Sequence, residues 1–375
     1  MKIGFLSTIG GYPWGGADFL WTRAAEAAQA RGDAVFLGLA APTAKHARVA
    51  ALVGGGAVLQ LRPAPAAPAS LATRVLNRLR PAAPAADPIV DALGAFAPDL
   101  VVISCGATYD LAYFPAWTDW LAATRTPFRV VANWQAERPA LPDAERGRIG
   151  RIFPAADALC FVSQRNLEVT RAHLGLPLPH ARVLHNPLRW TPADASPFPE
   201  SGPARLATAS RLEEGKGVHL LLQALKETGA ERGSWHLAIH GLGPQERELR
   251  ELTARLGLEA EVTFAGHVAD LRALWSGQQL LCSPAIEDGV PMTIPEAMLC
   301  GRPVLATCVG GAADWLRDKV TGFLCPAPTV PELTATLRTA LAARAKWPRL
   351  GRDAALAALA YYRPEDYRQL IVPPK

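Results

Sequence analysis

Residues 283–311 contain the side chains best suited to chemistry in this chain. They read SPAIEDGVPMTIPEAMLCGRPVLATCVGG: an acidic loop with a glycine, a helix that carries Glu296, an apolar strand and a second glycine turn. A nucleotide sugar presents hydroxyls, a diphosphate and a ribose close together. Carboxylates, open backbone amides and a helix N-terminus can meet these three groups. The order of this stretch therefore predicts a nucleotide-sugar site.

Two prolines indicate where this helix begins. Pro291 cannot lie within a helix and Pro295 is tolerated only in a first turn, so the predicted start is at about residues 292–294. Glu296 would then lie one turn in, where it could accept hydrogen bonds from two ribose hydroxyls or compensate the helix dipole. Asp288, at the start of the loop, could hold a sugar hydroxyl. The amides predicted to point at phosphate and sugar are those of Gly289, Val290, Met292 and Thr293.

Arg211 and Lys216 lie on either side of a turn in ASRLEEGKGVHLLLQAL, between a predicted strand and a predicted helix. Two cations at the carboxyl end of a strand can hold a diphosphate, the arginine through its bidentate fork and the lysine as a point charge. The alternative is a solvated turn in which Glu213 and Glu214 pair with both cations. The position after a strand favours the binding site.

A glycine-rich turn, TIGGYPWGGADF, follows the first predicted strand, and a helical pattern starts near Asp18. Such a turn brings backbone amides and a helix dipole to the crevice where open α/β sheets bind ligands. Gly15 and Gly16 are the candidates for close approach to a phosphate or an acceptor. The turn lacks the GxGxxG spacing of a dinucleotide site, and turns of this kind also form for structural reasons alone.

Two further turns belong to the second half of the chain. The sequence HGLGP places Gly241 and Gly243 after a predicted strand, where they could contact the ligand or only make the turn. After the strand VTFAG, backbone groups of His267 and Val268 could bind a base edge. His267 by itself is more typical of a turn than of a catalyst.

Apolar runs of strand length alternate with helical stretches along the chain. Continuous apolar strands of this kind are typical of a parallel sheet covered on both faces. The predicted strands of the first series are 3–7, 34–38, 57–61, 100–104, 128–132, 158–162 and 182–185. Those of the second series are 205–209, 236–240, 262–265, 280–283 and 303–307, separated by helices such as 245–256 and 331–344.

The two series predict an α/β protein with two doubly wound, Rossmann-like domains that face one another across a cleft. Residues 1–187 form the predicted N-terminal, acceptor-side domain and residues 204–352 the C-terminal, donor-binding domain. The segment 188–203 is rich in proline and polar residues and is predicted to be a linker. A length of 375 residues agrees with two domains.

Residues 62–88 interrupt this alternation. They are rich in alanine and proline around an amphipathic piece, SLATRVLNRLR, with leucines on one side and arginines on the other. Two interpretations stay open: an ordinary surface helix, or a basic element that contacts a membrane surface or an anionic acceptor.

Composition favours a folded cytoplasmic protein. The sequence has no apolar stretch long enough for a signal-peptide core or a membrane span. Its six cysteines are scattered without CxxC spacing and are predicted to be reduced core residues. The net charge of +5 comes from dispersed arginines, which argues against nucleic acid as a partner and is compatible with anionic small molecules.

These residues resemble glycosyltransferase family 4, whose members are retaining enzymes of the GT-B fold. The resemblance spans nearly the whole chain, through GGAD, FVSQRNLEVTRAHLG, VLHNP, SRLEEGKG, HGLGP, FAGHV and DGVPMTIPEAMLCGRPVLATCVGG. It implies a diphosphate site at Arg211 and Lys216 and a ribose site at Glu296, which closes an E-x7-E motif. The resemblance also implies that Gly15 and Gly16 approach phosphate and acceptor. A C-terminal helix within about 353–370 is implied to pack back on the first domain.

The chain departs from the family pattern at two places. The first position of E-x7-E is Asp288 with Glu287 beside it, so either carboxylate could take the sugar-binding role. Family members often carry a histidine after the strand that corresponds to 128–132, where this chain reads NWQAERP. The acceptor-side candidates in its place are Asn133, Trp134, Gln135 and Glu137.

The implied reaction is front-face substitution with retention, with Arg211, Lys216 and Asp288 as the catalytic candidates. The leaving diphosphate takes the acceptor's proton while the two cations stabilise its growing charge. No cofactor and no metal are expected, because the sequence has no DxD-type pair suited to a metal-held diphosphate. The expected partners are a nucleotide-sugar donor and a glycan, lipid-linked or small-molecule acceptor, with peripheral contact at the inner face of the membrane as a further expectation.

Other functions remain as alternatives. A nucleotide-sugar epimerase or hydrolase on the same fold would need histidines and carboxylates as acid and base. A non-catalytic nucleotide-sugar-binding subunit would tolerate both departures from the family pattern. A dinucleotide oxidoreductase is disfavoured, because neither half shows GxGxxG with an acidic residue downstream.

Overall fold

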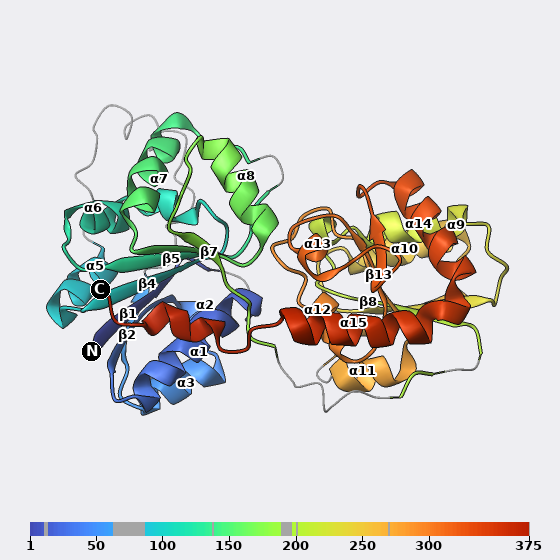
Figure 1. The fold of residues 1–375 in the computed structure, drawn as a ribbon, viewed down its shortest axis with the longest axis horizontal. Coiled ribbons are helices and arrows are strands. Elements are labelled where there is room, and N and C mark those ends of the chain that lie inside the picture. The colour runs from blue at the N-terminus through green and yellow to red at the C-terminus, as the bar shows by residue number, and fades with distance from the viewer. Residues whose placement is uncertain are drawn as a thin grey trace. The chain divides into compact units, whose positions relative to one another are not determined.

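The computed structural model describes residues 1–10, 14–62, 87–136, 139–188, 197–199, 202–268 and 271–374 (Figure 1). They form two compact units. The first unit consists of Met1–Val162, Leu167–Pro187 and Pro364–Lys375, and the second of Ser163–Asn166 and Leu188–Arg363.

Within the described residues, the first unit contains a seven-stranded parallel sheet in the order β3-β2-β1-β4-β5-β6-β7. Its strands are β1 (Lys2–Ser7), β2 (Ala34–Ala40), β3 (Val58–Arg62), β4 (Leu100–Cys105), β5 (Phe128–Ala132), β6 (Ala158–Phe161) and β7 (Ala181–Val183). Its helices are α1 (Gly16–Ala30), α2 (Ala41–Ala44), α3 (Ala47–Gly54), α5 (Pro88–Phe96), α6 (Pro115–Ala123), α7 (Asp143–Ala155) and most of α8 (Gln164–Leu174), with 3-10 turns η1 (Asp110–Tyr113) and η5 (Asp366–Ile371). The strand order reverses between β1 and β4.

The described part of the second unit contains a six-stranded parallel sheet in the order β10-β9-β8-β11-β12-β13. Its strands are β8 (Ala204–Ala209), β9 (Trp235–His240), β10 (Val262–Gly266), β11 (Leu280–Ser283), β12 (Val304–Thr307) and β13 (Gly322–Cys325). Its helices are α9 (Val218–Glu227), α10 (Glu246–Leu256), α11 (Leu271–Gly277), α12 (Thr293–Leu299), α13 (Ala312–Trp315), α14 (Val330–Ala342) and α15 (Trp347–Tyr361), with 3-10 turns η3 (Glu214–Lys216) and η4 (Arg344–Lys346). Here the order reverses between β8 and β11.

The strands are buried because they are apolar at successive positions. Every residue of β4 and of β5 is buried, as expected where helices cover both faces of a parallel sheet. Figure 1 shows helices on both sides of each sheet. Each unit has its own apolar core, built around Phe36 and Phe161 in the first and around Leu237 and Trp347 in the second.

The predicted doubly wound architecture of both halves is confirmed. All twelve predicted strands are present with bounds shifted by a few residues at most, and helices form at 246–256 and 330–342. Strand β13 was not among the predicted strands. Most of the predicted linker lies outside the described residues, as does the amphipathic piece within 62–88.

The C-terminal stretch corrects one expectation. A helix within about 353–370 was implied to pack back on the first domain, but α15 ends at Tyr361 and packs on α12 and α13 of the second unit. Tyr362 is extended and Pro364 follows, which ends the helix because proline restricts the residue before it. The chain returns to the first unit from Pro364 onward, and η5 packs there on α1.

The cysteines also differ from expectation in one case. All six are free thiols and five are buried, whereas Cys308 is exposed. Burial raises the pKa of the Cys160 and Cys282 thiols to about 12. In the part of the chain that the structure describes, no helix combines the length and the apolar character needed to span a bilayer.

We expect Arg129→Met to detach the C-terminal turn from the first unit. Arg129 is buried; its Nε donates to Asp157 Oδ2 at 2.9 Å and its Nη1 to the Gln369 carbonyl at 2.8 Å. Removing it leaves both acceptors unpaired, which should cost about 1–3 kcal/mol of unfolding free energy. Denaturant unfolding and limited proteolysis after residue 363 would measure this.

The control is Arg182→Met, since Arg182 is exposed and donates to the Gln369 side chain at 3.3 Å. Equal destabilisation by both variants would contradict the role assigned to Arg129.

Candidate functional site

The loops that follow β8 and β11 meet where the strand order of the second sheet reverses. Open α/β sheets bind ligands at this point, outside the carboxyl ends of the strands. The Gly215 carbonyl accepts hydrogen bonds from the amides of Ile286 and Glu287, at 2.8 and 3.1 Å. Gly217 has a φ of +65°, and a Cβ there would lie 2.0 Å from the Pro284 carbonyl oxygen. Only glycine permits this contact between the two loops.

A third loop, after β12, joins the same place. The Gly311 amide donates to the Gly289 carbonyl at 2.6 Å. Gly310 has a φ of +53°, and a Cβ on it would lie 2.2 Å from the Asp288 carbonyl oxygen. The three loops therefore contact one another through backbone atoms. The close approach of the third loop requires the glycine turn at Gly310 and Gly311. We call them the β8, β11 and β12 loops, for residues 210–217, 284–292 and 308–311.

An ion pair ties the β8 loop to the β11 loop. Lys216 Nζ lies 2.5 Å from Asp288 Oδ2, and the Gly289 amide donates to Asp288 Oδ1 at 2.9 Å. The side chains of Lys216 and Asp288 are 21% and 14% exposed, so water screens this pair only in part. An ammonium has three donor hydrogens, so Lys216 can bind a phosphate oxygen while it holds Asp288.

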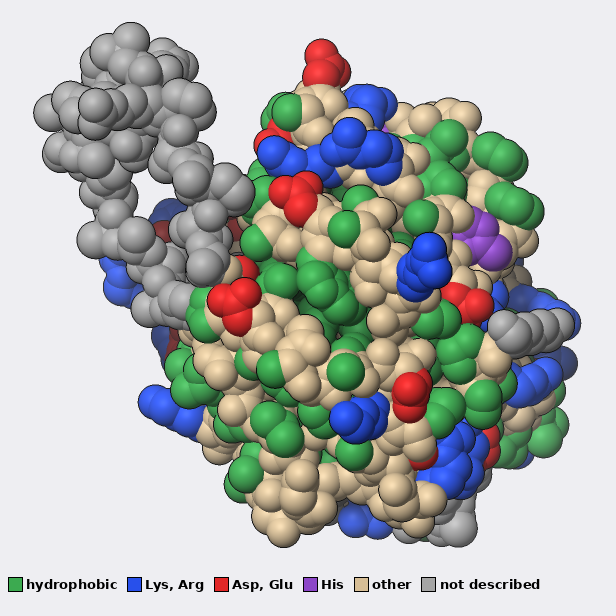
Figure 2. All heavy atoms as spheres, turned by 90° about the vertical axis from the view of Figure 1, so that its left-hand side faces the viewer, with side chains coloured by type: hydrophobic (Ala, Val, Ile, Leu, Met, Phe, Trp, Pro, Cys, Tyr) green, Lys and Arg blue, Asp and Glu red, His purple; other side chains and the backbone are tan. Residues whose placement is uncertain are grey.

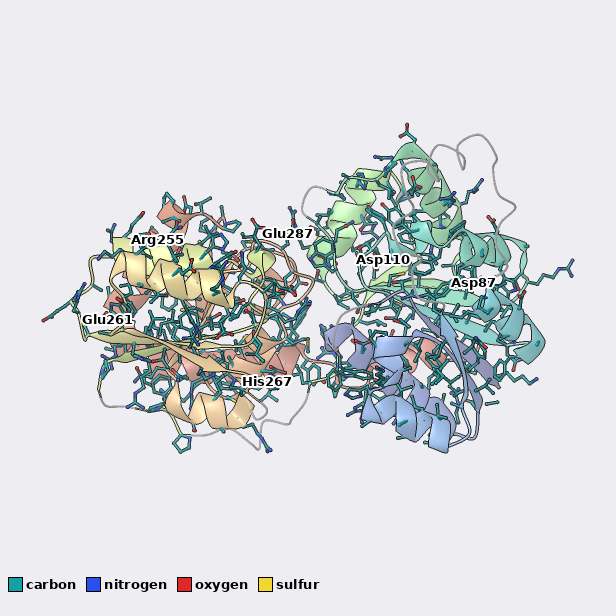
Figure 3. All side chains as sticks on the ribbon, turned by 180° about the vertical axis from the view of Figure 1, so that it is seen from behind. Asp87, Asp110, Arg255, Glu261, His267 and Glu287 are labelled. Carbon is teal, nitrogen blue, oxygen red and sulfur yellow. The ribbon has the colours of Figure 1, made fainter. Side chains whose placement is uncertain are left out.

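The two predicted cations behave differently. Arg211 is exposed, and its Nη1 pairs with Glu213 at 2.9 Å, as in the solvated-turn alternative. Lys216 instead pairs with Asp288, 72 residues away, which sequence spacing could not indicate. Asp288 has a protein donor on each oxygen, whereas Glu287 beside it is exposed (Figure 3).

Glu296 lies where the sequence predicted, in the first turn of a helix that begins at Thr293. It is only 2% exposed. Met292 and Thr293 are half-buried, Gly289 is buried and Val290 is partly buried.

Gly243 has a packing role in this unit. A Cβ on it would lie 2.3 Å from the Leu212 carbonyl oxygen, and the Leu242 carbonyl accepts the Leu212 amide at 3.0 Å. His267 is exposed after β10 (Figure 3), and Val268 packs against the core of the second unit.

The acceptor-side candidates lie after β5 in the first unit, where the side chains of two of them make hydrogen bonds within the fold. Asn133 Nδ2 donates to the Cys105 carbonyl at 2.8 Å, and its Oδ1 is buried without a hydrogen-bond partner. Gln135 Nε2 donates to Thr170 Oγ1 at 3.0 Å, which ties it to α8. Trp134 is half-buried, and Glu137 lies outside the described residues.

The polar cluster at the carboxyl ends of β1 and β4, where the first sheet reverses order, was not predicted from the sequence. Asp110 Oδ2 accepts from Thr8 Oγ1 at 3.0 Å and from the Ala107 amide at 2.9 Å. Burial raises the pKa of the Asp110 carboxyl, against the effect of these bonds and of Arg62. Arg62 donates to the carbonyls of Ser7, Thr8 and Ile9 at 3.4, 3.0 and 3.1 Å, and so fixes the start of the glycine loop.

The glycine loop is described from Trp14 onward. Gly15 is the N-cap of α1, and its amide donates to Asp18 Oδ2 at 3.1 Å, so α1 begins at Gly16, slightly before the predicted start. A Cβ on Gly15 would meet no atom within 4 Å, which leaves open space beside the loop.

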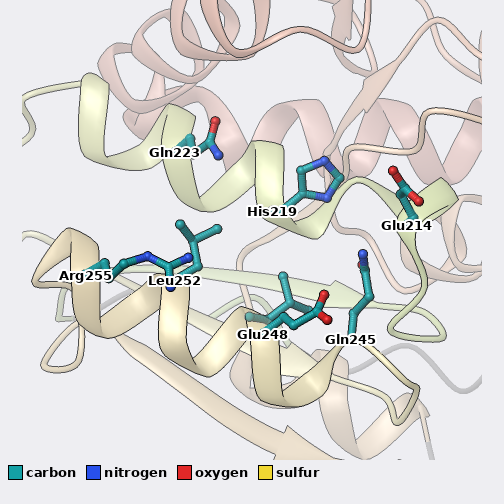
Figure 4. A pocket seen from close by; sticks show the side chains of 8 residues that line it. Glu214, His219, Gln223, Gln245, Glu248, Leu252 and Arg255 are labelled. Atoms are coloured by element: carbon teal, nitrogen blue, oxygen red, sulfur yellow. The ribbon is translucent and has the colours of Figure 1, made fainter.

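A shallow pocket of about 250 Å³ lies between α9 and α10 (Figure 4). It is lined by Glu214, His219, Gln223, Gln245, Glu248, Leu249, Leu252 and Arg255. Glu214 and Gln245 come from the loops after β8 and β9, so the pocket lies beside the β8 loop. Its lining mixes both charges and gives no single ligand chemistry. Among the described residues, no cluster of three or more His, Cys, Asp or Glu side chains could hold a metal.

Surface charge on one face of the molecule is mixed. Figure 2 shows Lys and Arg side chains dispersed among acidic and hydrophobic ones on that face.

Part of the second unit matches a known family model. Residues 203–343 match the family model described as Glycosyl transferases group 1. This range contains all three loops together with Lys216, Asp288 and Glu296.

Two curated relatives match part of the chain. An uncharacterized glycosyltransferase from Haemophilus influenzae is 28% identical over 146 residues, 37% of this chain and 41% of the relative. The 2-deoxystreptamine glucosyltransferase of Streptomyces kanamyceticus is 26% identical over 219 residues, 55% of each chain. The chain therefore spans about half the length of these relatives, or less.

A solved structure matches the chain over its whole length. The Anabaena protein Alr3699/HepE in complex with UDP gives a TM-score of 0.75 at 21% identity, covering 99% of this chain and 98% of that one. At this identity the likeness shows the fold, which is GT-B with two Rossmann-like domains.

We expect Gly243→Ala to destabilise the second unit by about 1–3 kcal/mol, because the new methyl group would overlap the Leu212 backbone. Gly147→Ala is the control, since Gly147 lies in α7 with nothing within 4 Å of its Cβ position. Thermal unfolding should show a loss for the first variant and a small gain for the second. An unchanged unfolding temperature of Gly243→Ala would contradict the close packing of Gly243 against the Leu212 backbone.

We expect Asp110→Asn to stabilise the protein near neutral pH. The folded-state pKa of Asp110 is raised above the unfolded value of 3.8. At a pH above the folded-state pKa, the carboxylate is charged within the fold, and this charge destabilises the folded state. The advantage of the variant should shrink as pH falls through the folded pKa and vanish below 3.8. Denaturant unfolding across pH would measure it, with the exposed Asp119→Asn as control; a gain that grows toward acid would refute the assignment.

Proposed function

We propose that the chain is a retaining glycosyltransferase that uses a nucleotide diphosphate sugar. The observation that carries this proposal is the meeting of the β8, β11 and β12 loops at the point where the second sheet reverses order. The three loops lie inside the segment that matches the glycosyl transferases group 1 model. They bring Lys216, Asp288 and open backbone to one place, and the β11 loop leads into α12, which carries the buried Glu296.

The donor is proposed to bind through its diphosphate at the β8 loop. Lys216 is held in position by Asp288, so little side-chain freedom remains to be lost when a phosphate binds. Arg211 lies at an exposed position beside Glu213 and would turn its fork to the phosphate. These two cations would stabilise the leaving diphosphate, so the proposal includes no metal and no cofactor.

The remaining donor contacts follow from the same loops. Glu296 is proposed to bind the ribose, and the amides of Val290, Met292 and Thr293 the phosphate and sugar. Since both Asp288 oxygens already accept protein hydrogen bonds, its main role is to position Lys216, and the exposed Glu287 is the freer carboxylate for a sugar hydroxyl. The backbone at His267 and Val268 is proposed to contact the base.

A uridine nucleotide is the first donor to test. The Anabaena protein of the same fold was solved with UDP, and a related Streptococcus gordonii subunit is named as a UDP-N-acetylglucosamine transferase. The acceptor is proposed to be a glycan, a lipid-linked sugar or a small molecule. Gly15, Gly16 and residues 133–137 of the first unit are proposed to contribute to its binding, in a cytoplasmic setting.

The decisive assay measures sugar release and transfer from a panel of UDP, GDP and ADP sugars. We expect Lys216→Met to lower kcat by about 10²- to 10³-fold, the cost of removing one donor to a developing negative charge. The exposed Lys226→Met, with the same change of charge on α9, should keep wild-type activity.

Three outcomes decide between the functions. A product that keeps the donor's anomeric configuration supports retention, whereas an inverted product contradicts it. Binding of UDP without turnover on any donor would favour the non-catalytic nucleotide-sugar-binding subunit. Equal activity of Lys216→Met and wild type would remove the proposed diphosphate site.

A further inference from the structure

The outward face of α15 is both basic and apolar. Its inward face packs Trp347, Leu350, Ala354 and Ala358 into the second unit. Because an α-helix turns once every 3.6 residues, the opposite side carries Arg349, Arg352, Leu356 and Leu359. In Figure 1, α15 runs along one face of the second unit. We call these four side chains the α15 face.

The two leucines are unusually open for their size. Leu356 is 66% exposed and Leu359 is 46% exposed, and they lie about one turn apart on the same side of the helix. They are three positions apart in the sequence, so a flat surface placed on this side would cover both. Scattered single apolar side chains need no explanation, but an aligned pair beside unneutralised charge is less ordinary.

The arginines of this face are not neutralised within the protein. The structure assigns no ion pair to Arg349, Arg352 or the neighbouring Lys346, all exposed, within the residues it describes. On α10, by contrast, Arg247 and Arg250 pair with glutamates one turn away, at 2.8 Å in each case. The sequence of α15 contains one acidic residue, Asp353. Asp353 lies one turn from Arg349 without an ion pair to it, and it is outnumbered by Lys346, Arg349 and Arg352, so this side of the helix keeps a net positive charge.

We propose that the α15 face docks on an anionic lipid surface. Arginines beside exposed leucines suit such a surface, because the guanidinium groups pair with lipid phosphates while the leucines enter the boundary of the acyl region. A protein partner with an acidic groove would offer the same charge but would need a matching concave shape. This inference does not depend on the proposed donor chemistry, since no residue of the α15 face belongs to the three loops.

The test is vesicle flotation of the full chain with phosphatidylcholine alone and with added phosphatidylglycerol. We expect binding only to the anionic vesicles, weakened by salt. Arg349→Gln/Arg352→Gln should weaken binding by about 25-fold, about fivefold per charge. Leu356→Gln/Leu359→Gln should weaken it by at least about tenfold. Because all four side chains are exposed, each variant should keep the wild-type unfolding temperature.

Matched controls isolate the face. Arg125→Gln/Arg151→Gln removes the same charge from exposed positions of the first unit, and Val320→Gln removes an exposed apolar side chain of the second. Both should float as wild type does. No flotation of the wild type with anionic vesicles would overturn the proposal, and so would equal binding by all variants, which would place the contact elsewhere. Self-association that Leu356→Gln/Leu359→Gln abolishes, without vesicle binding, would assign the face to a second copy instead.

Discussion

The candidate site depends on backbone contacts between loops that glycine alone allows. Gly217 brings the β8 loop against the Pro284 carbonyl, and Gly310 brings the β12 loop against the Asp288 carbonyl. Each contact leaves no room for a Cβ and requires a positive φ. Since these loops follow strands that lie side by side in the sheet, the sheet sets their position and the glycines set how closely they approach.

The two cations of the candidate site, Lys216 and Arg211, are held by different kinds of partner. Lys216 is held by an acid from another loop, whereas Arg211 is held by a near neighbour at the surface. An ordered cation binds a phosphate with less loss of side-chain entropy, while an exposed one can follow a ligand as it moves. The family match covers the segment that contains both cations, and the fold match covers the whole chain.

Strands and local turns could be predicted because their physical causes are local. The apolar runs that form β4 and β5 are buried along their whole length. Pro291 and Pro295 placed the start of α12 within one residue of its observed start at Thr293. The partner of Lys216 could not be predicted, because Glu213 and Glu214 are near it in sequence while Asp288 is near it only in the fold. Likewise, nothing near Arg62 in sequence indicates that it binds the end of β1. The break between α15 and η5 was missed although Pro364 was a local signal for it.

A crystal structure of the chain with UDP tests the central claim most directly. The account predicts a diphosphate within hydrogen-bond distance of Lys216 Nζ and of backbone amides of the β11 loop, with the ribose at Glu296. A UDP molecule bound elsewhere, such as between α9 and α10, with no ligand at Lys216, would contradict it.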